Sequence, residues 1–142
     1  MTDVPTRSTT DVEVRYAETD QMGVVHHSRY LVWFELARTQ LCREAGHPYD
    51  EIEKQGLWLM VSGAHLSYRD GARYGDRVQV ECRVSRAASR ALHFDYRVLR
   101  GEQLLVSGRT EHIWVDAETK TTTRAPAELL ALFREMAAAE RD

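Results

Sequence analysis

The chain has 142 residues, about one domain, and its 43% hydrophobic and 29% charged residues are ordinary for a folded globular protein. A formal net charge of −3 argues against a general nucleic-acid binder, because such domains usually carry a clear basic excess. No unbroken apolar run is longer than five residues, the length of the run from Leu57 to Val61. A membrane-spanning helix needs ~20 apolar residues, so no membrane insertion is expected.

The first ten residues are polar and resemble a frayed, disordered tail rather than a secretory signal, which needs an apolar core. Without such a signal, a cytoplasmic location is expected. The two cysteines, Cys42 and Cys82, are then best interpreted as reduced, buried thiols. A disulfide between them stays open.

The first structured element predicted after the tail is a half-buried strand. Val12, Val14 and Tyr16 alternate with charged residues from residue 11 onward. The strand ends in a polar segment over residues 18–23 that finishes with a glycine.

A long helix is predicted next, with Ser28 as N-cap and Gly46 marking its end. At 100° per residue its main apolar face is Tyr30, Phe34, Ala37, Leu41 and Ala45. Val32, Trp33 and Leu36 lie on other faces, so the helix is expected to be buried on more than one side.

A short polar linker over residues 50–56 separates this helix from four predicted strands, at about 57–68, 78–84, 92–99 and 104–115. Short turns between them predict an antiparallel meander. Pro126 then opens a short C-terminal helix. The order predicts an α+β fold, a five-stranded antiparallel sheet around one long helix, forming a single domain over residues 11–138.

The segment that carries chemistry joins the first strand to the long helix. Asp20 lies in its loop, and His27 follows seven residues later at the helix start. The first N–H groups of a helix are unpaired and partly positive, so they can stabilise an oxyanion. A carboxylate opposite them could act as nucleophile or as general base. The alternative is that Asp20 serves only as a turn or capping residue.

The same segment resembles a known family. It reads Arg15-Tyr16-x-Glu18-Thr19-Asp20-x-x-Gly23-Val24-Val25-x-His27-x-x-Tyr30-x-x-x-Phe34-Glu35-x-Ala37-Arg38. This pattern looks like the signature of the 4-hydroxybenzoyl-CoA thioesterase-like hotdog proteins, in their bacterial acyl-CoA thioesterase branch. The similarity continues through Tyr68 to Pro126.

The resemblance implies a hotdog fold, in which the sheet wraps around the helix, and a homodimer or homotetramer. It implies hydrolysis of an acyl-CoA to a free acid and coenzyme A, with catalytic roles for Asp20 and His27. It also places Tyr16 beside the site. Two alternatives stay open: an acyl carrier protein as the acyl donor, or a module that binds acyl-CoA without turnover.

Further substrate-binding candidates are Tyr30 and Glu35 on the helix, each with a structural alternative: packing for Tyr30 and a pair with Arg38 for Glu35. The turn Arg86-Ser89-Arg90 could bind coenzyme A phosphates, because arginine binds phosphate bidentately, or could be a solvated hairpin. The histidines are too scattered to predict a metal site. The sequence has no glycine-rich phosphate loop, so no nucleotide cofactor is expected.

Overall fold

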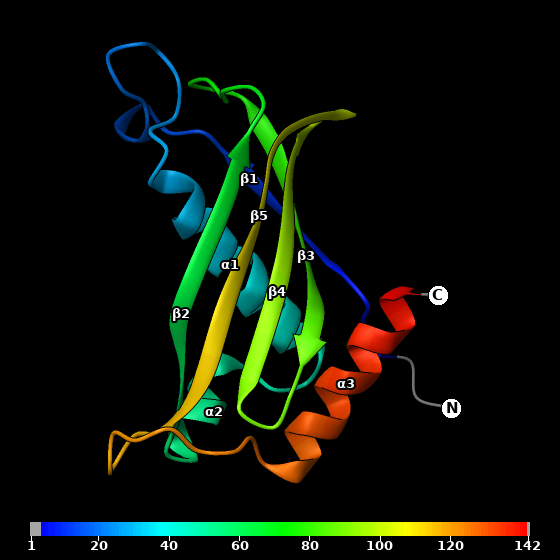
Figure 1. Cartoon of the computed structure of the whole chain (residues 1–142). Coiled ribbons are helices and arrows are strands. Elements are labelled where there is room, and N and C mark those ends of the chain that lie inside the picture. Colours follow the sequence, from blue (N-terminus) through cyan, green and yellow to red (C-terminus); the bar gives the residue numbers. More distant parts are fainter. Residues whose placement is uncertain (1–3, 142) are drawn as a thin grey trace.

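The computed structural model of the chain describes residues 4–141. Its elements in chain order are β1 (Ser8–Glu13), the 3-10 helix η1 (Tyr16–Glu18), α1 (Arg29–Glu44), α2 (Tyr49–Lys54), β2 (Leu57–Tyr68), β3 (Arg77–Ala87), β4 (Ala91–Arg100), β5 (Gln103–Asp116) and α3 (Ala127–Arg141) (Figure 1). None of the helices in this part of the chain is long and apolar enough to cross a membrane.

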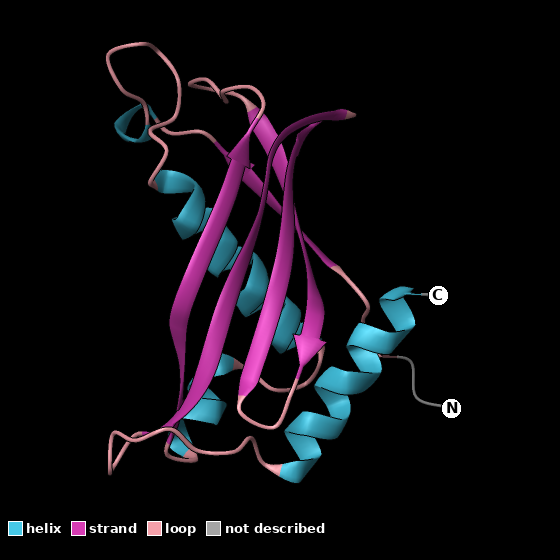
Figure 2. Cartoon of the chain, viewed as in Figure 1, coloured by secondary structure: helices cyan, strands magenta, loops and turns pink. Residues whose placement is uncertain are grey.

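The five strands form one antiparallel sheet in the order β1-β3-β4-β5-β2 (Figure 2). The predicted meander holds for β3, β4 and β5. It is wrong for β2, which pairs with β5 at the far edge instead of with β3. Residues 69–76 between β2 and β3 therefore pass from one side of the sheet to the other, along the end that also carries the β1–α1 loop (Figure 1).

Helix α1 packs on one face of the sheet, with the predicted apolar face turned inward. Tyr30, Phe34, Ala37 and Leu41 are all buried. The ring of Phe34 stacks on that of Tyr96 in β4, with centroids 4.1 Å apart. Alternating burial along β3 and β4 puts every second side chain into this same core, as the period of a half-buried strand requires.

Two expectations about the N-terminal region need correction. Strand β1 begins at Ser8, which pairs with Cys82, so residues 8–10 belong to the sheet and not to a tail. Residues 1–3 lie outside the described part of the chain. Tyr16 was predicted on the buried face of the strand, but β1 ends at Glu13 and Tyr16 lies exposed in η1. The alternating pattern runs past the strand because Val14 is buried after pairing has stopped.

The helices also differ from the predictions. The expected linker over residues 50–56 contains α2, whose single buried side chain, Ile52, gives almost no periodic signal. The C-terminal helix was expected to be short, but α3 spans 15 residues against 16 for α1. It packs through Phe133 against Trp114, and the Arg134 side chain donates to the carbonyl of Ala87 at the end of β3.

Candidate active site

The loop that carries Asp20 is held in place by backbone pairing at both of its sides. Thr19 and Val25 form an isolated antiparallel bridge, and Val24 bridges to Arg73 in the β2–β3 connection. The two segments thus lie side by side at one end of the sheet, as Figure 1 shows. Within the bridge, residues 20–23 make a tight turn in which Gly23 adopts a positive φ of 81°, a conformation that favours glycine.

Glu18 anchors the start of this loop to α1. Its side chain is buried, and its carboxylate accepts hydrogen bonds from the Trp33 indole at 2.7 Å and from the Arg15 N–H at 2.8 Å. Burial alone raises the pKa of Glu18, but these hydrogen bonds outweigh it and the pKa is lowered, so the buried group stays ionised. Sequence reasoning gave Glu18 no role, although it belongs to the recognised signature.

The carboxylate of Asp20 is only partly used by the turn. Its Oδ1 accepts the Met22 N–H at 2.8 Å, which is the bond expected of a turn-forming aspartate. Its Oδ2 has no hydrogen-bond partner within residues 4–141. The residue is half-buried. Asp20 therefore stabilises the turn, as the alternative interpretation expected, and still has one carboxylate oxygen free to react.

The start of α1 is left without the side-chain cap that Ser28 was expected to supply. Ser28 occupies the N-cap position, but its hydroxyl lies 2.8 Å from Nδ1 of His26 and makes no cap hydrogen bond. The N–H of His27 donates to no acceptor in the described residues. Tyr68 from β2 donates its hydroxyl to the His27 carbonyl at 3.2 Å and fixes the orientation of this peptide.

Asp20 and His27 open onto the same cleft of about 340 Å³. Tyr30 forms part of its wall, but its hydroxyl accepts the Ala72 N–H at 3.2 Å and burial raises its pKa, so it is a neutral structural group here. The cleft is lined by side chains of the loop, of α1 and of the β2–β3 connection: Asp20, Met22, Val24, Val25, His27, Tyr30, Tyr68, Arg69, Asp70 and Gly71.

The other candidate residues lie outside this cleft in the single chain. Tyr16 packs edge-on against Tyr74 and is 76% exposed. Glu35 lines a different hollow, between α1 and β2. The turn with Arg86, Ser89 and Arg90 joins β3 to β4 at the opposite end of the sheet from the Asp20 loop (Figure 1).

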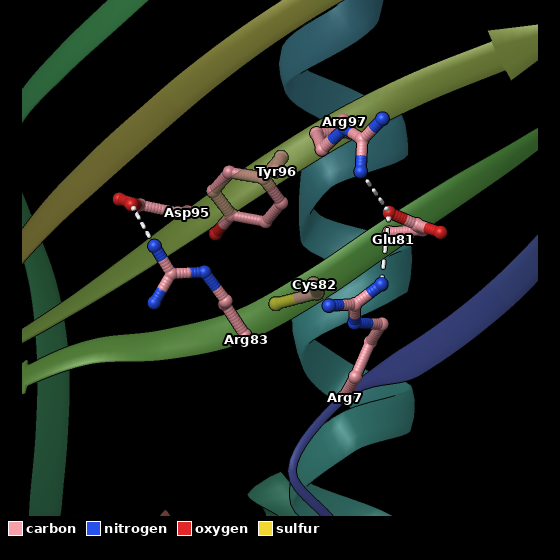
Figure 3. A pocket seen from close by; sticks show the side chains of 7 residues that line it. All are labelled: Arg7, Glu81, Cys82, Arg83, Asp95, Tyr96 and Arg97. Atoms are coloured by element: carbon pink, nitrogen blue, oxygen red, sulfur yellow. Dashed lines mark hydrogen bonds and ion pairs between the residues drawn. The ribbon is translucent and has the colours of Figure 1, made fainter. Parts of the chain in front are cut away.

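Apart from the cleft and the hollow at Glu35, the outer face of the sheet carries a hollow of about 190 Å³, shown in Figure 3. Glu81 lies 3.5 Å from Arg7 and 3.4 Å from Arg97, while Asp95 accepts from Arg83 at 3.0 Å. Glu81 with Arg97 and Asp95 with Arg83 are cross-strand pairs, which stabilise a solvated sheet surface. No three potential metal ligands gather anywhere in the described residues. The candidate site is therefore the cleft at the start of α1.

Comparison with known proteins gives the family of the chain. The profile of the Thioesterase-like superfamily matches residues 14–133 of the chain. The chain is 36% identical over 110 residues to the putative acyl-CoA thioesterase YneP of Bacillus subtilis, covering 77% of this chain and 80% of that protein. It is 31% identical over 126 residues to the acyl-CoA thioesterase YbgC of Haemophilus influenzae, covering 88% and 93%.

Solved structures agree in the fold. The hypothetical protein TT1821 of Thermus thermophilus superposes with a TM-score of 0.87 at 41% identity, covering 91% of this chain and 98% of that one. The DHNA-CoA thioesterase of Staphylococcus aureus superposes with a TM-score of 0.89 at 29% identity, covering 95% and 93%. The five-stranded antiparallel sheet and C-terminal helix are thus those of the hotdog thioesterases, and the chain belongs to the thioesterase-like hotdog superfamily, in its bacterial acyl-CoA thioesterase branch.

Proposed function

We propose that the protein is an acyl-CoA thioesterase, which hydrolyses an acyl-CoA to a free carboxylic acid and coenzyme A. One observation carries the proposal. A carboxylate oxygen of Asp20 and the N–H of His27, both without partners in the described residues, belong to residues that line one cleft at the start of a helix. A pair of this kind suits attack on a thioester carbonyl.

In the proposed reaction, the His27 N–H and the positive end of α1 bind the thioester carbonyl oxygen and stabilise the negative charge that develops on it. Asp20 then acts in one of two ways. It attacks the carbonyl carbon and forms an anhydride that water hydrolyses, or it takes a proton from a water molecule that attacks directly. In both cases the C–S bond breaks and coenzyme A leaves as the thiol after protonation.

Two contacts fix the position of Asp20: its own hydrogen bond in the turn, and the buried Glu18, which holds the loop against α1. Because Glu18 bonds to Trp33 of α1 and Asp20 follows two residues later, the loop cannot move independently of the helix start. Such fixed geometry is what electrostatic stabilisation of a transition state requires. Glu18 is thus proposed as a positioning residue.

The proposed enzyme is a homo-oligomer whose basic unit is a dimer. Strand β2 is a sheet edge with one side unpaired, and open edges favour pairing with another chain. Large apolar side chains are exposed on α1 (Leu31, Val32 and Leu36) and on β2 itself (Trp58, Met60 and Val61). Trp33, also predicted to be outside the main helix face, is instead buried within the chain.

A dimer would also account for the candidate residues that lie far from the cleft. If two β2 edges pair antiparallel, opposite ends of the two sheets become neighbours. The Arg86-Ser89-Arg90 turn of one copy then approaches the Asp20 end of the other, where it can bind the phosphates of coenzyme A. We propose that the complete site contains this turn from the second copy.

We further propose that the chain acts as a single domain in the cytoplasm, and that this domain extends beyond the expected residues 11–138 to include all of β1 and α3, from Ser8 to Arg141. The family profile covers nearly that whole range, and Cys42 and Cys82 are both free and buried. Unpaired thiols suit a reducing compartment.

The test is thiol release from a panel of acyl thioesters that vary in acyl group and carrier. Hydrolysis of at least one acyl-CoA with saturation kinetics is expected. A protein that acts only on acyl carrier protein thioesters would show the same chemistry on another carrier. Tight binding of acyl-CoA with no thiol release from any substrate would establish a binding module and overturn the proposed enzyme.

A further inference from the structure

Arg38 is a buried cation without an anion. It lies on α1 with 8% of its surface exposed, and no carboxylate within residues 4–141 comes within ion-pair distance of its guanidinium. Its Nη1 lies 3.5 Å from the Tyr96 hydroxyl, at the long limit of a hydrogen bond. Its buried Nε has no hydrogen-bond partner in the described part of the chain.

Such an arrangement is unfavourable unless something else supplies an acceptor. A guanidinium does not lose its proton in proteins and has only donors to offer. A buried charge without a partner costs several kcal/mol in general, and a buried unpaired donor adds to that cost. Nε itself is shielded from solvent, but 8% of the Arg38 surface stays exposed, so an external oxygen at that surface can supply the guanidinium with an acceptor.

Arg38 lines a hollow of about 200 Å³ between α1 and β2. Its polar lining residues are Glu35, which is exposed, and the buried residues Arg38 and Thr110. The Thr110 hydroxyl is already engaged, at 2.6 Å from the Tyr96 hydroxyl and 2.8 Å from Nε2 of His112. Of the two buried polar side chains that line the hollow, Arg38 is thus the one with an unused hydrogen bond. The apolar lining residues are Leu31, Val32, Val61 and Ala64, and the first three also belong to the apolar surface of the proposed dimer, so the hollow lies at the edge of that interface.

The hollow and the catalytic cleft lie along the same pair of elements. Tyr30 of α1 and Tyr68 of β2 line the cleft, while residues further along α1 and earlier in β2 line the hollow. From the start of α1 at Arg29 to Arg38, a helix rises ~14 Å. That span is longer than a single aromatic ring attached to a thioester carbonyl, and it suits a chain of medium length.

We propose that the hollow between α1 and β2 receives the far end of the acyl group, and that Arg38 selects acyl groups bearing an acceptor oxygen there. The substrate class is a medium-chain acyl-CoA with a terminal hydroxyl or carboxylate. A plain hydrocarbon end would leave the guanidinium desolvated and unpaired, and sites built to hydrogen-bond a group reject analogues that lack it. The inference rests on the proposed thioesterase function and assigns its specificity.

Glu35 distinguishes the two kinds of oxygen. Its carboxylate lines the same hollow and attracts Arg38 without pairing with it, since no ion pair forms between them in the described residues. A terminal hydroxyl can donate to Glu35 and accept from Arg38, whereas a terminal carboxylate is repelled by Glu35. Glu35→Gln is therefore expected to improve the carboxylate substrate relative to the hydroxyl substrate.

The experiment compares three acyl-CoAs of about ten carbons, the length that the ~14 Å path suggests: unsubstituted, ω-hydroxy and ω-carboxy. For the unaltered protein, kcat/KM for at least one oxygen-bearing substrate is expected to exceed that for the unsubstituted one by at least ~10-fold. Equal rates, or a preference for the plain chain, would overturn the inference.

Two arginine variants on the same helix identify the residue responsible. Arg38→Met, which keeps a long apolar side chain, is expected to reverse the preference toward the unsubstituted substrate. Arg43→Met, on the exposed side of α1, is the matched control and should keep it. If Arg38→Met still prefers the oxygen-bearing acyl-CoA, a residue other than Arg38 selects the substrate and the inference is wrong. Loss of the dimer in Arg38→Met, with no preference in the unaltered protein, would show that the second copy occupies the hollow.

Binding measurements separate this inference from the proposed reaction. The dissociation constants of the three acyl-CoAs are measured with Asp20→Asn, in which turnover is expected to be very slow. The same order of preference there supports the specificity site even if no hydrolysis occurs in the unaltered protein. Equal dissociation constants together with normal hydrolysis would refute the specificity site and leave the thioesterase function intact.

Discussion

Asp20 combines two uses of one carboxylate, and a single substitution separates them. Asparagine can keep an oxygen in the Oδ1 position, so the hydrogen bond from the Met22 N–H and the turn are expected to persist in Asp20→Asn. The negative charge is lost. We expect kcat for acyl-CoA to fall at least ~10²-fold, with the melting temperature nearly unchanged.

The control for this prediction is an aspartate of the same local geometry elsewhere. Asp116 accepts the N–H groups of Glu118 and Thr119 in the turn after β5, far along the chain from the cleft. Asp116→Asn should leave kcat unchanged. Near-normal turnover in Asp20→Asn would remove Asp20 from the mechanism.

His112 links residue chemistry to stability. It is fully buried, with its Nε2 against Thr110, and burial, helped by the charge of Arg38, lowers its pKa from 6.5 to about 4. Between these values the unfolded chain binds the proton and the folded chain does not. The free energy of unfolding should therefore fall as pH drops from 6.5 toward 4, by roughly 3 kcal/mol in all from this group.

Urea unfolding at pH 7 and pH 4.5 measures this effect. His112→Asn should show a markedly smaller loss of stability between the two pH values than the unaltered chain. His65→Asn, at an exposed position on β2, should behave like the unaltered chain. An identical loss in all three proteins would assign the pH dependence to other groups, such as Glu18.

At the scale of elements, the contact between α1 and β5 depends on the absence of a side chain. A Cβ at Gly108 would lie 2.6 Å from the Phe34 ring and 2.9 Å from the His65 carbonyl oxygen. The ring cannot retreat, because it stacks on Tyr96. We expect Gly108→Ala to lower the free energy of unfolding by ~1–3 kcal/mol, measured by chemical denaturation.

A double-variant cycle tests the cause. If the clash with Phe34 is responsible, Gly108→Ala should cost less in a Phe34→Leu background than in the unaltered one. Ser107→Ala, one residue earlier on β5, should change stability little. Additive costs in the double variant would place the strain at the His65 carbonyl instead.

The sequence predicts elements well where periodicity reports burial, and poorly where pairing depends on distant residues. The bounds of β2 were predicted as observed, and α1 ends before Gly46 as expected. The partner of β2 was not predictable, because turn lengths between neighbours do not reveal a crossover to β5. Helix α2 was missed because only Ile52 is buried.

The candidate site was predicted in a similar way. The position of Asp20 before a helix start followed from the sequence and the resemblance, and the structure puts both Asp20 and His27 on one cleft. The anchoring role of Glu18 was not predictable, since it depends on a hydrogen bond to Trp33, 15 residues away. The unpaired state of Arg38 likewise appears only when its neighbours on β4 and β5 are placed.

At the scale of the whole molecule, the proposed dimer makes the Arg86-Ser89-Arg90 turn a binding element. Arginine–phosphate pairs contribute equally in the ground and transition states, so their loss should appear in KM. Arg86→Ala combined with Arg90→Ala is expected to raise KM for acyl-CoA and leave kcat within a few-fold. The effect should shrink for a short thioester that lacks the nucleotide.

The charge-matched control is Arg43→Ala with Arg77→Ala, which removes two exposed arginines elsewhere. It should leave KM unchanged. Unchanged KM for both thioesters in the Arg86 and Arg90 variant would make the turn a solvated hairpin. A fall in kcat alone would indicate a distorted sheet instead of lost phosphate contacts.

The dimer itself is tested at Leu36, which is 49% exposed on α1. Leu36→Glu adds a charge that a monomer tolerates in solvent but that an interface would bury at considerable cost. Light scattering is expected to show an oligomer for the unaltered chain and a monomer for Leu36→Glu at micromolar concentration. Ala131→Glu adds the same charge on the exposed side of α3 and should keep the oligomer.

Because the second copy is proposed to supply the phosphate-binding turn, KM for acyl-CoA should rise together with dissociation in Leu36→Glu. A monomer with unchanged KM would mean that one chain contains the whole site.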